Sequence, residues 1–225
     1  MGQIDTMEMV ARIGLYFIPF LFALSFHEFA HAWVAKRKGD NTAELMGRLN
    51  VNPFAHADVI GTFLLPMMAI LSGWNFLFGW AKPVPVNAYN LRYPKEDMFW
   101  IAFAGPLSNL FLAVIGSFVF VIFMLFGPKG GTADMVAQMM SFFIVINLVL
   151  CIFNMIPLHP LDGGKVMARF LPDSWNRVLE EQQMALQVIL IVFFVTGGFR
   201  YLAIPVFWLR DLILGSIMGL FSIFI

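Results

Sequence analysis

Residues 98–127, MFWIAFAGPLSNLFLAVIGSFVFVIFMLFG, decide the fold class, because they contain no Asp, Glu, Lys or Arg. About 20 apolar residues let an α-helix cross the hydrocarbon core of a bilayer, and this stretch is longer than that. Residues 135–161 are also free of these charged residues and also exceed that length. Both stretches therefore predict membrane-spanning helices.

The composition agrees with a membrane protein, since 60% of the 225 residues are hydrophobic and only 12% are charged. Soluble domains carry about 25% charged residues, which argues against a water-soluble globule. The 14 basic and 14 acidic residues balance, and no basic stripe indicates a nucleic-acid partner. We expect the lipid bilayer, and not nucleic acid, as a partner, while the oligomeric state cannot be read from the sequence.

Three further stretches, 11–35, 184–199 and 201–225, are candidate spans, although a proline and an adjacent charged pair interrupt the last one. The sequence thus predicts an all-α polytopic membrane protein with about five transmembrane helices. We expect one membrane-embedded domain over 1–225, with its core at about 11–170 and C-terminal helices at about 184–225.

The basic residues orient these helices, because Lys and Arg concentrate in short cytoplasmic loops. Most of them lie in 36–58, 81–97 and 163–183, which predicts that these loops are cytoplasmic. Residues 59–80 are apolar, yet both of their flanks then lie on the same side. We therefore predict a re-entrant or bent segment, and an ordinary span with one misassigned loop is the alternative.

Two short segments at the predicted cytoplasmic surface, 45–51 and 81–86, look extended rather than helical. Pro83 and Pro85 push the residues before them toward extended conformations. Short membrane-associated β-strands are expected here, and simple loops are the alternative.

The first predicted helix contains His27-Glu28-Phe29-Ala30-His31, an HExxH sequence. Residues four apart on a helix lie one turn above each other, so both imidazoles can bind one ion. This pattern suits one Zn²⁺ ion, with His27 and His31 as ligands and Glu28 as the general base toward water. The alternative is a metal-free polar cluster or a proton pathway.

A catalytic zinc usually takes three protein ligands, and Asp162 is the best candidate for the third. It follows the second long uncharged stretch, where Pro157 and Pro160 cannot continue a regular helix. By the predicted topology, Asp162 reaches the same side of the membrane as the histidines. The alternative is an aspartate that caps a helix or turn before Gly163-Gly164.

Together these motifs resemble the site-2 protease family of intramembrane metalloproteases, peptidase family M50. The resemblance rests on HEFAH and on the NxxPxxxLDGG pattern of residues 154–164. Residues 105–109 (GPLSN) resemble the family's GPxxN element, and residues 79–87 (GWAKPVPVN) resemble its small bacterial and archaeal members. The similarity covers about residues 20–170.

The resemblance implies a zinc endopeptidase of a bacterial or archaeal cell membrane, with its active site toward the cytoplasm. Its expected partners are transmembrane protein substrates, cut within or near their membrane spans. Glu28 would be the catalytic residue and His27, His31 and Asp162 the metal ligands.

Three further residues are candidates for a supporting role in that site. Asn109 and Asn154 are candidates for orienting a ligand or contacting substrate, and Asn109 could equally hold helices together. His56 is a candidate for lining a water path, with a solvated loop histidine as the alternative.

The rival function is a membrane metal-ion or proton transporter that uses the same polar residues. The later predicted spans carry few ionisable residues, which counts against it.

Overall fold

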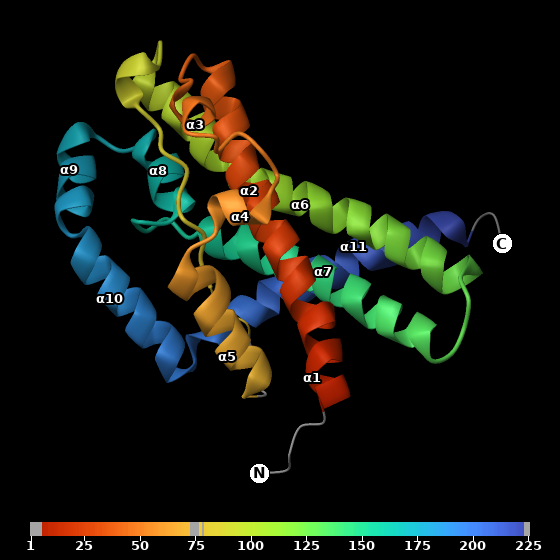
Figure 1. The fold of residues 1–225 in the computed structure, drawn as a ribbon. Helices are drawn as coiled ribbons and strands as arrows, with labels where there is room; N and C mark the ends of the chain where they lie inside the picture. Colours follow the sequence, from red (N-terminus) through yellow and green to blue (C-terminus); the bar gives the residue numbers. More distant parts are fainter. Residues whose placement is uncertain (1–5, 73–76, 78, 223–225) are drawn as a thin grey trace.

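The computed structural model describes residues 6–72, 77 and 79–222, and within this part all regular structure is helical (Figure 1). The N-terminal half contains α1 (Thr6–Arg12), η1 (Ile13–Phe17), α2 (Ile18–Arg37), α3 (Thr42–Leu45), α4 (Pro53–His56), η2 (Val59–Leu64), α5 (Leu65–Leu71) and η3 (Ala88–Asn90). The remainder contains α6 (Pro94–Phe126), α7 (Thr132–Asn154), α8 (Asp162–Ala168), α9 (Asp173–Glu181), α10 (Gln183–Phe193), η4 (Phe194–Gly198) and α11 (Phe199–Phe221).

Four helices in the described residues are long and apolar enough to cross a membrane. They are Met9–Arg37, Pro94–Phe126, Thr132–Asn154 and Thr196–Phe221. All four overlap predicted spans, namely 11–35, 98–127, 135–161 and 201–225. The helix predicted over 135–161 ends at Asn154, shortly before Pro157, because proline lacks the N–H that a helix needs.

The prediction of about five spans is wrong at the C-terminal end of the described chain. The segment predicted over 184–199 is helical but too short for a span: α10 has only 11 residues, a π-helical turn follows it, and Gly197, near the predicted end, adopts a φ of 101°. A positive φ interrupts the helix, and glycine adopts it without a steric penalty. The span predicted over 201–225 overlaps the candidate span Thr196–Phe221, which contains Pro205 in its interior; residues 223–225 lie outside the described residues.

Residues 59–80 are predicted to form a re-entrant or bent segment, and its two described ends contact each other. The helical part of this segment ends at Leu71, and the Trp80 N–H donates to the Gly61 carbonyl at 3.1 Å. The Thr62 hydroxyl in turn donates to the Trp80 carbonyl at 2.8 Å. The two ends of the segment therefore lie side by side, while residues 73–76 and 78, which the prediction also covers, lie outside the described part.

The predicted β-strands are wrong for the part of the chain described. Of the segment predicted over 45–51, only Leu45 is helical, as the last residue of α3, and residues 46–51 form turns and bends; residues 81–86 run as an extended chain without pairing to a strand (Figure 1). The backbone groups of 81–87 bond to other partners. The Lys82 N–H donates to the His56 carbonyl, and the Arg48 guanidinium donates to the Lys82 and Pro83 carbonyls.

Helix α7 lies between two hydrophobic cores. One is formed mainly by residues of α2 around Phe20, of α5 around Ile70 and of α7 around Ile146. The other joins Ile144 and Leu148 of α7 to α6, η4 and α11. These contacts bring α2, α6 and α7 together, and the candidate site lies among them.

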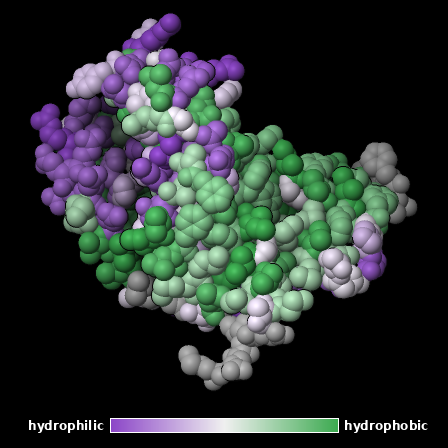
Figure 2. Space-filling model, in the orientation of Figure 1, coloured by the Kyte–Doolittle hydropathy of each residue, from purple (hydrophilic) through white to green (hydrophobic). Residues whose placement is uncertain are grey.

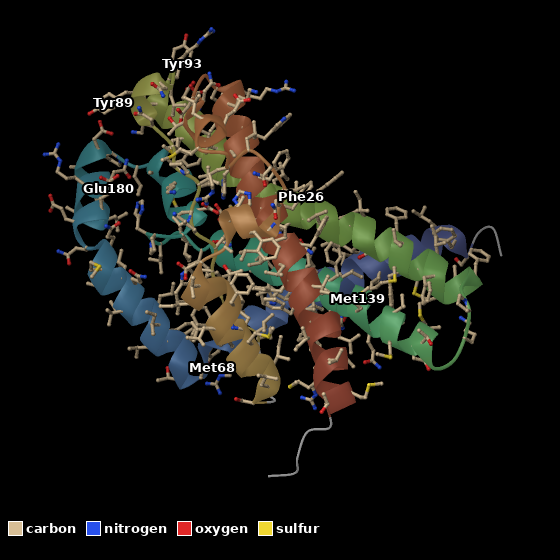
Figure 3. The ribbon with its side chains drawn as sticks, viewed as in Figure 1. Phe26, Met68, Tyr89, Tyr93, Met139 and Glu180 are labelled. Atoms are coloured by element: carbon tan, nitrogen blue, oxygen red, sulfur yellow. The ribbon has the colours of Figure 1, made fainter. Side chains whose placement is uncertain are left out.

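The outer surface divides into a polar and an apolar region. Hydrophilic residues gather over the ends of α2 and α6 and over α8 and α9, and hydrophobic residues cover most of the rest of the visible bundle, apart from a small polar patch at the right-hand end (Figure 2). Tyr89 and Tyr93 project from the polar end, while Met139 lies along the apolar part of α7 (Figure 3). Such a large exposed apolar surface is typical of a protein that contacts lipid.

Candidate metal centre

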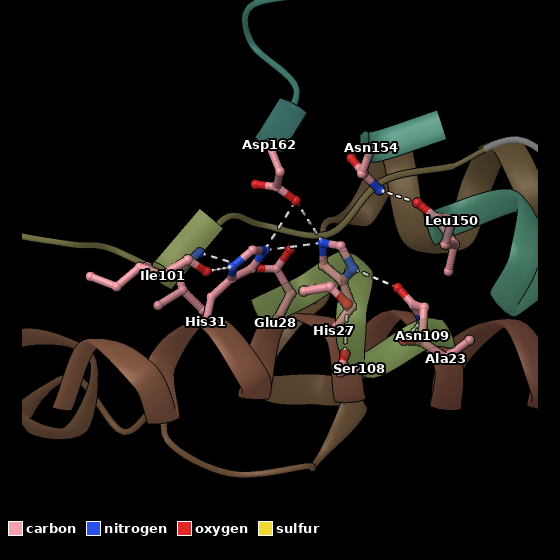
Figure 4. Close-up of polar contacts among 12 residues, drawn as sticks. Ala23, His27, Glu28, His31, Ile101, Ser108, Asn109, Leu150, Asn154 and Asp162 are labelled. Atoms are coloured by element: carbon pink, nitrogen blue, oxygen red, sulfur yellow. Dashed lines mark hydrogen bonds and ion pairs between the residues drawn. The ribbon is translucent and has the colours of Figure 1, made fainter. Parts of the chain in front are cut away.

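Three potential metal ligands from two distant segments meet in the interior of the bundle. His27 and His31 lie one turn apart on α2, and Asp162 is the first residue of α8 (Figure 4). One ligand atom from each of the three lies within 4.8 Å of the others, and all three side chains are largely removed from solvent.

The three atoms form a nearly equilateral triangle. The Asp162 Oδ2 atom is 3.1 Å from His27 Nε2 and 3.2 Å from His31 Nε2, and the two nitrogens are 3.1 Å apart. Ligands placed tetrahedrally around zinc at about 2.0–2.1 Å are themselves about 3.3–3.4 Å apart. The triangle is therefore close to the size that one small divalent cation requires.

The other nitrogen of each imidazole faces an oxygen. The Nδ1 atom of His31 is 2.6 Å from the Ile101 carbonyl, which can only accept a hydrogen bond. The Nδ1 atom of His27 is 2.6 Å from Oδ1 of Asn109. Both Nδ1 atoms therefore carry the proton in the neutral imidazoles, and each Nε2 presents a lone pair. Two lone pairs and a carboxylate oxygen converge, an arrangement that a cation stabilises.

The orientation of the Asn109 amide is fixed by a second asparagine. The Asn147 amide nitrogen donates to the Phe143 carbonyl at 2.8 Å, so its oxygen is left to accept. Asn109 Nδ2 donates to that oxygen at 2.8 Å and to the Ala23 carbonyl at 3.1 Å. This leaves Asn109 Oδ1 for His27, and the amide chain from α7 sets the tautomer of the imidazole on α2.

Asp162 is positioned by the unwound chain that follows α7. Residues 155–161 turn back tightly, with hydrogen bonds from Leu158 to Ile156 and from Leu161 to Leu158. A side chain at Gly163 would lie 2.3 Å from the Ile156 carbonyl oxygen, so the start of α8 packs directly on this turn. Glycine is required for that close approach.

Glu28 contacts the extended segment 81–87. Its Oε2 atom accepts a hydrogen bond of 3.0 Å from the Val84 N–H, and Figure 4 shows its side chain beside the two imidazoles. One carboxylate oxygen is thereby held in place. Because Arg48 binds the carbonyls of Lys82 and Pro83, it fixes the same segment from the other side.

The far end of segment 81–87 is tied down by Asp40. Its carboxylate accepts hydrogen bonds from the Asn87 N–H at 2.7 Å and from the Asn90 amide at 2.8 Å. Burial disfavours the charge on Asp40, but the bonds from Thr42, Asn90 and Asn87 outweigh this and lower its pKa. Asp40 therefore stays ionised and holds the segment at neutral pH.

Of the three supporting residues that the sequence indicated, only Asn109 joins the centre. The Asn154 amide donates to the Leu150 carbonyl one turn back on α7 (Figure 4). His56 is 1% exposed, so it is not a solvated loop histidine, and its Nε2 donates to the Asn50 carbonyl at 2.7 Å. Burial lowers the pKa of His56, which keeps it neutral.

Comparison with known proteins assigns the chain to a family. A protein of Bacillus subtilis (strain 168) named "Putative zinc metalloprotease YwhC" is 36% identical over 208 residues, which cover 91% of this chain and 90% of that protein. The family model described as "Peptidase family M50" matches residues 128–197. The chain belongs to peptidase family M50.

Other M50 relatives are bacterial and archaeal. The Mycobacterium tuberculosis (strain H37Rv) protein of the same description, Rip2, is 26% identical over 92% of this chain and 78% of its own length. The Methanocaldococcus jannaschii protein MJ0611, also so described, is 32% identical over 67% of this chain and 64% of its own length. No solved structure matches the chain.

The region that the M50 model matches contains Asp162 but not the two histidines. The centre of this M50 peptidase is thus assembled from two separate parts of the chain, and α6 lies between them in sequence.

Sequence reasoning missed Asn147, which is 0% exposed in the middle of a long uncharged span. A lone amide in such a span was the available signal, since buried amides in membranes need partners.

Gly105 of α6 packs against the two imidazoles, and a substitution there tests this contact. An added Cβ atom would lie 2.4 Å from His31 Nε2 and 2.6 Å from His27 Cε1, so both imidazoles would have to move. We expect Gly105→Ala to lower metal affinity about 10–100-fold, the range seen when the groups that orient metal ligands are altered. Competition for zinc with a chelating dye measures this.

The matched control for Gly105→Ala is Gly215→Ala on α11, where an added Cβ meets nothing within 4 Å. The control should bind zinc as the wild type does. Equal zinc affinity in both variants would show that α6 does not pack on the histidines as described.

Proposed function

We propose that this M50 peptidase is a zinc endopeptidase that hydrolyses peptide bonds within or near the transmembrane segments of other membrane proteins. The observation that carries the proposal is the convergence of His27 Nε2, His31 Nε2 and Asp162 Oδ2 at separations of 3.1–3.2 Å. Both histidines belong to a helix long enough to span a membrane. The name of the YwhC relative supports the choice of metal and reaction.

Zinc bound by these three groups would polarise water and the scissile carbonyl. The residues of the chain do the rest. Asn109 and the Ile101 carbonyl hold the imidazoles in the ligating tautomer, and the Val84 N–H holds one oxygen of Glu28. The other Glu28 oxygen takes a proton from the attacking water and delivers it to the leaving amine nitrogen as the C–N bond breaks.

The depth of the site supports substrates that lie in the membrane. His31 and His27 are six and ten residues before Arg37, the last residue of α2, or about 9 and 15 Å along the helix axis. The basic loops flanking α2 and α6 indicate that this end faces the cytoplasm. The active site would thus lie inside the cell membrane, in its cytoplasmic part, and segment 59–80 would enter the membrane from the same side and return.

A substrate must expose a backbone amide before it can be cut, and a transmembrane helix has all its amides paired. We therefore expect faster cleavage of a single-span substrate with two glycines in its span than of the same substrate with leucines there. The expected difference is about tenfold or more, because each helix-interior glycine costs about 1 kcal/mol. Cleavage in vesicles containing the purified protein, followed by gel electrophoresis and mass spectrometry, measures this.

Two results of this experiment would contradict the proposal. One is equal cleavage of both spans, and the other is cleavage of water-soluble peptides alone. The same vesicles test the transporter function: zinc or proton flux without any cleavage would favour it over proteolysis.

A further inference from the structure

Two adjoining cavities lie where α2 ends and α6 begins, at the polar end of the bundle seen in Figure 2. The first has a volume of about 370 Å³ and is lined by Lys36, Arg37, Lys38, Gly39, Arg92, Tyr93 and Asp97. The second has a volume of about 320 Å³ and adjoins it through Arg37 and Lys38, which line both. Neither cavity contains a residue of the metal centre.

The first cavity carries an excess of positive charge. Four of its lining residues are cationic and one is anionic. Lys36 is paired with Glu44 at 2.6 Å, and Lys38 is paired with Asp97 at 3.0 Å. Among the described residues, the guanidinium groups of Arg37 and Arg92 have no carboxylate partner, so they are available to an anion.

The second cavity is apolar and lies between two membrane-spanning helices. Besides Arg37 and Lys38, it is lined by Trp33, Val34, Trp100, Phe103, Ala104 and Leu107. The Arg37 guanidinium lies over the Trp33 ring at 4.5 Å from its centroid. Trp33 and Trp100 are each about one to two turns from the end of their helix, the level at which tryptophan concentrates in membrane proteins.

We propose that these two cavities bind one anionic phospholipid from the cytoplasmic leaflet. The phosphate of its headgroup would lie in the cationic cavity and contact Arg37 and Arg92. One acyl chain would lie in the apolar groove against Trp33, Trp100 and Leu107. Basic pockets between transmembrane helices suit anionic headgroups, and arginine matches phosphate with two donors at once.

The charge and the groove select this occupant together. A soluble anion would need only the cationic cavity, and a zwitterionic lipid would bring its own ammonium group to a cavity that already has an excess of positive charge. An anionic phospholipid matches both features, because its phosphate is linked through glycerol to two acyl chains. The groove runs along α2 and α6, and the hydrogen bond between His31 and the Ile101 carbonyl joins the same two helices. Binding should therefore stabilise this helix pair.

The test is competition between lipids on the purified full-length chain. The protein is equilibrated in mixed micelles with equal amounts of phosphatidylglycerol and phosphatidylcholine, and the lipid retained is identified by native mass spectrometry. We expect one phosphatidylglycerol per chain in preference to phosphatidylcholine. Glycerol phosphate, which has the headgroup charge without acyl chains, should fail to displace it at equal concentration.

Charge removal should abolish the preference. In the double variant Arg37→Gln/Arg92→Gln, phosphatidylglycerol affinity should fall about 25-fold, because each basic residue near an anionic lipid contributes about a factor of five. The matched control is Arg177→Gln/Arg200→Gln, which removes two exposed arginines outside both cavities; Arg200 stacks on Tyr201 as Arg37 does on Trp33. The control should retain the lipid as the wild type does.

The groove is tested without changing charge by Ala104→Trp, which fills it from α6 and should also reduce retention. If the double variant does not unfold cooperatively on heating, and so is not properly folded, the single variant Arg92→Gln replaces it in the lipid competition. Arg92 lies at an exposed position before α6. Equal retention of both lipids, unchanged retention in these variants, or displacement by glycerol phosphate would each overturn the proposal. The last result would indicate a site for a soluble anion.

Discussion

Glu28→Gln is expected to lower the rate of peptide-bond hydrolysis about 10²–10⁴-fold, the contribution typical of a positioned acid–base residue. Glutamine keeps the size of the side chain and can still accept the hydrogen bond from the Val84 N–H, so the segment around Val84 should stay in place. It cannot take a proton from water. Zinc should remain bound, because the three converging ligand atoms belong to other residues.

The measurement compares cleavage of the two-glycine substrate and zinc content in the same preparations. The matched control is Glu181→Gln, which makes the same substitution at an exposed position at the end of α9. The control should cleave at the wild-type rate. Cleavage by Glu28→Gln within a few-fold of wild type would remove Glu28 from the chemistry.

Asp162→Asn should lose zinc as well as activity, whereas Glu28→Gln should lose activity alone. The substitution removes the negative charge opposite two imidazole lone pairs at 3.1 and 3.2 Å. Altering a group that only orients a ligand costs about 10–100-fold in metal affinity, so loss of a ligand charge should cost more than about 100-fold. Zinc content after dialysis against a weak chelator, measured by mass spectrometry, and cleavage as a function of added zinc test this.

The control for this variant is Asp134→Asn, in the exposed first turn of α7. It makes the same chemical change away from the centre and should leave zinc content at the wild-type level. If Asp162→Asn retained zinc through dialysis as this control does, Asp162 would not be the third ligand. The pair of variants at Glu28 and Asp162 thus separates the base from the ligand.

The sequence foresaw that His27, His31 and Asp162 would converge, because two of them have a strict helical spacing. Residues four apart always lie on the same face of an α-helix, so the helix alone brings His27 and His31 together, whatever the rest of the fold. Asp162 was placed by the alternation of spans and by two prolines that end α7, and the structure brings it to both imidazoles. The amide of Asn147 was not foreseen, since it acts only through Asn109 on a neighbouring helix.

The errors of prediction have local causes. Pro83 and Pro85 indicated an extended backbone, which the structure has. The N–H and carbonyl groups of this backbone bond to side chains such as Arg48 and Glu28, and not to a neighbouring strand as was expected. The predicted boundary between 184–199 and 201–225 lies close to the break at Gly197, but the helix before it is too short for a span, since α10 has only 11 residues and a π-helical turn follows it. Both errors arise where a backbone conformation, and not the apolar pattern, decides the structure.

X-ray absorption at the zinc edge, on the zinc-loaded wild-type protein, shows directly whether His27, His31 and Asp162 hold the metal. We expect one zinc ion per chain, with two imidazole nitrogens and at least one oxygen at about 2.0–2.1 Å, and no sulfur ligand. A coordination shell with one imidazole or none, or a protein that binds no zinc and still cleaves its substrate, would contradict this expectation.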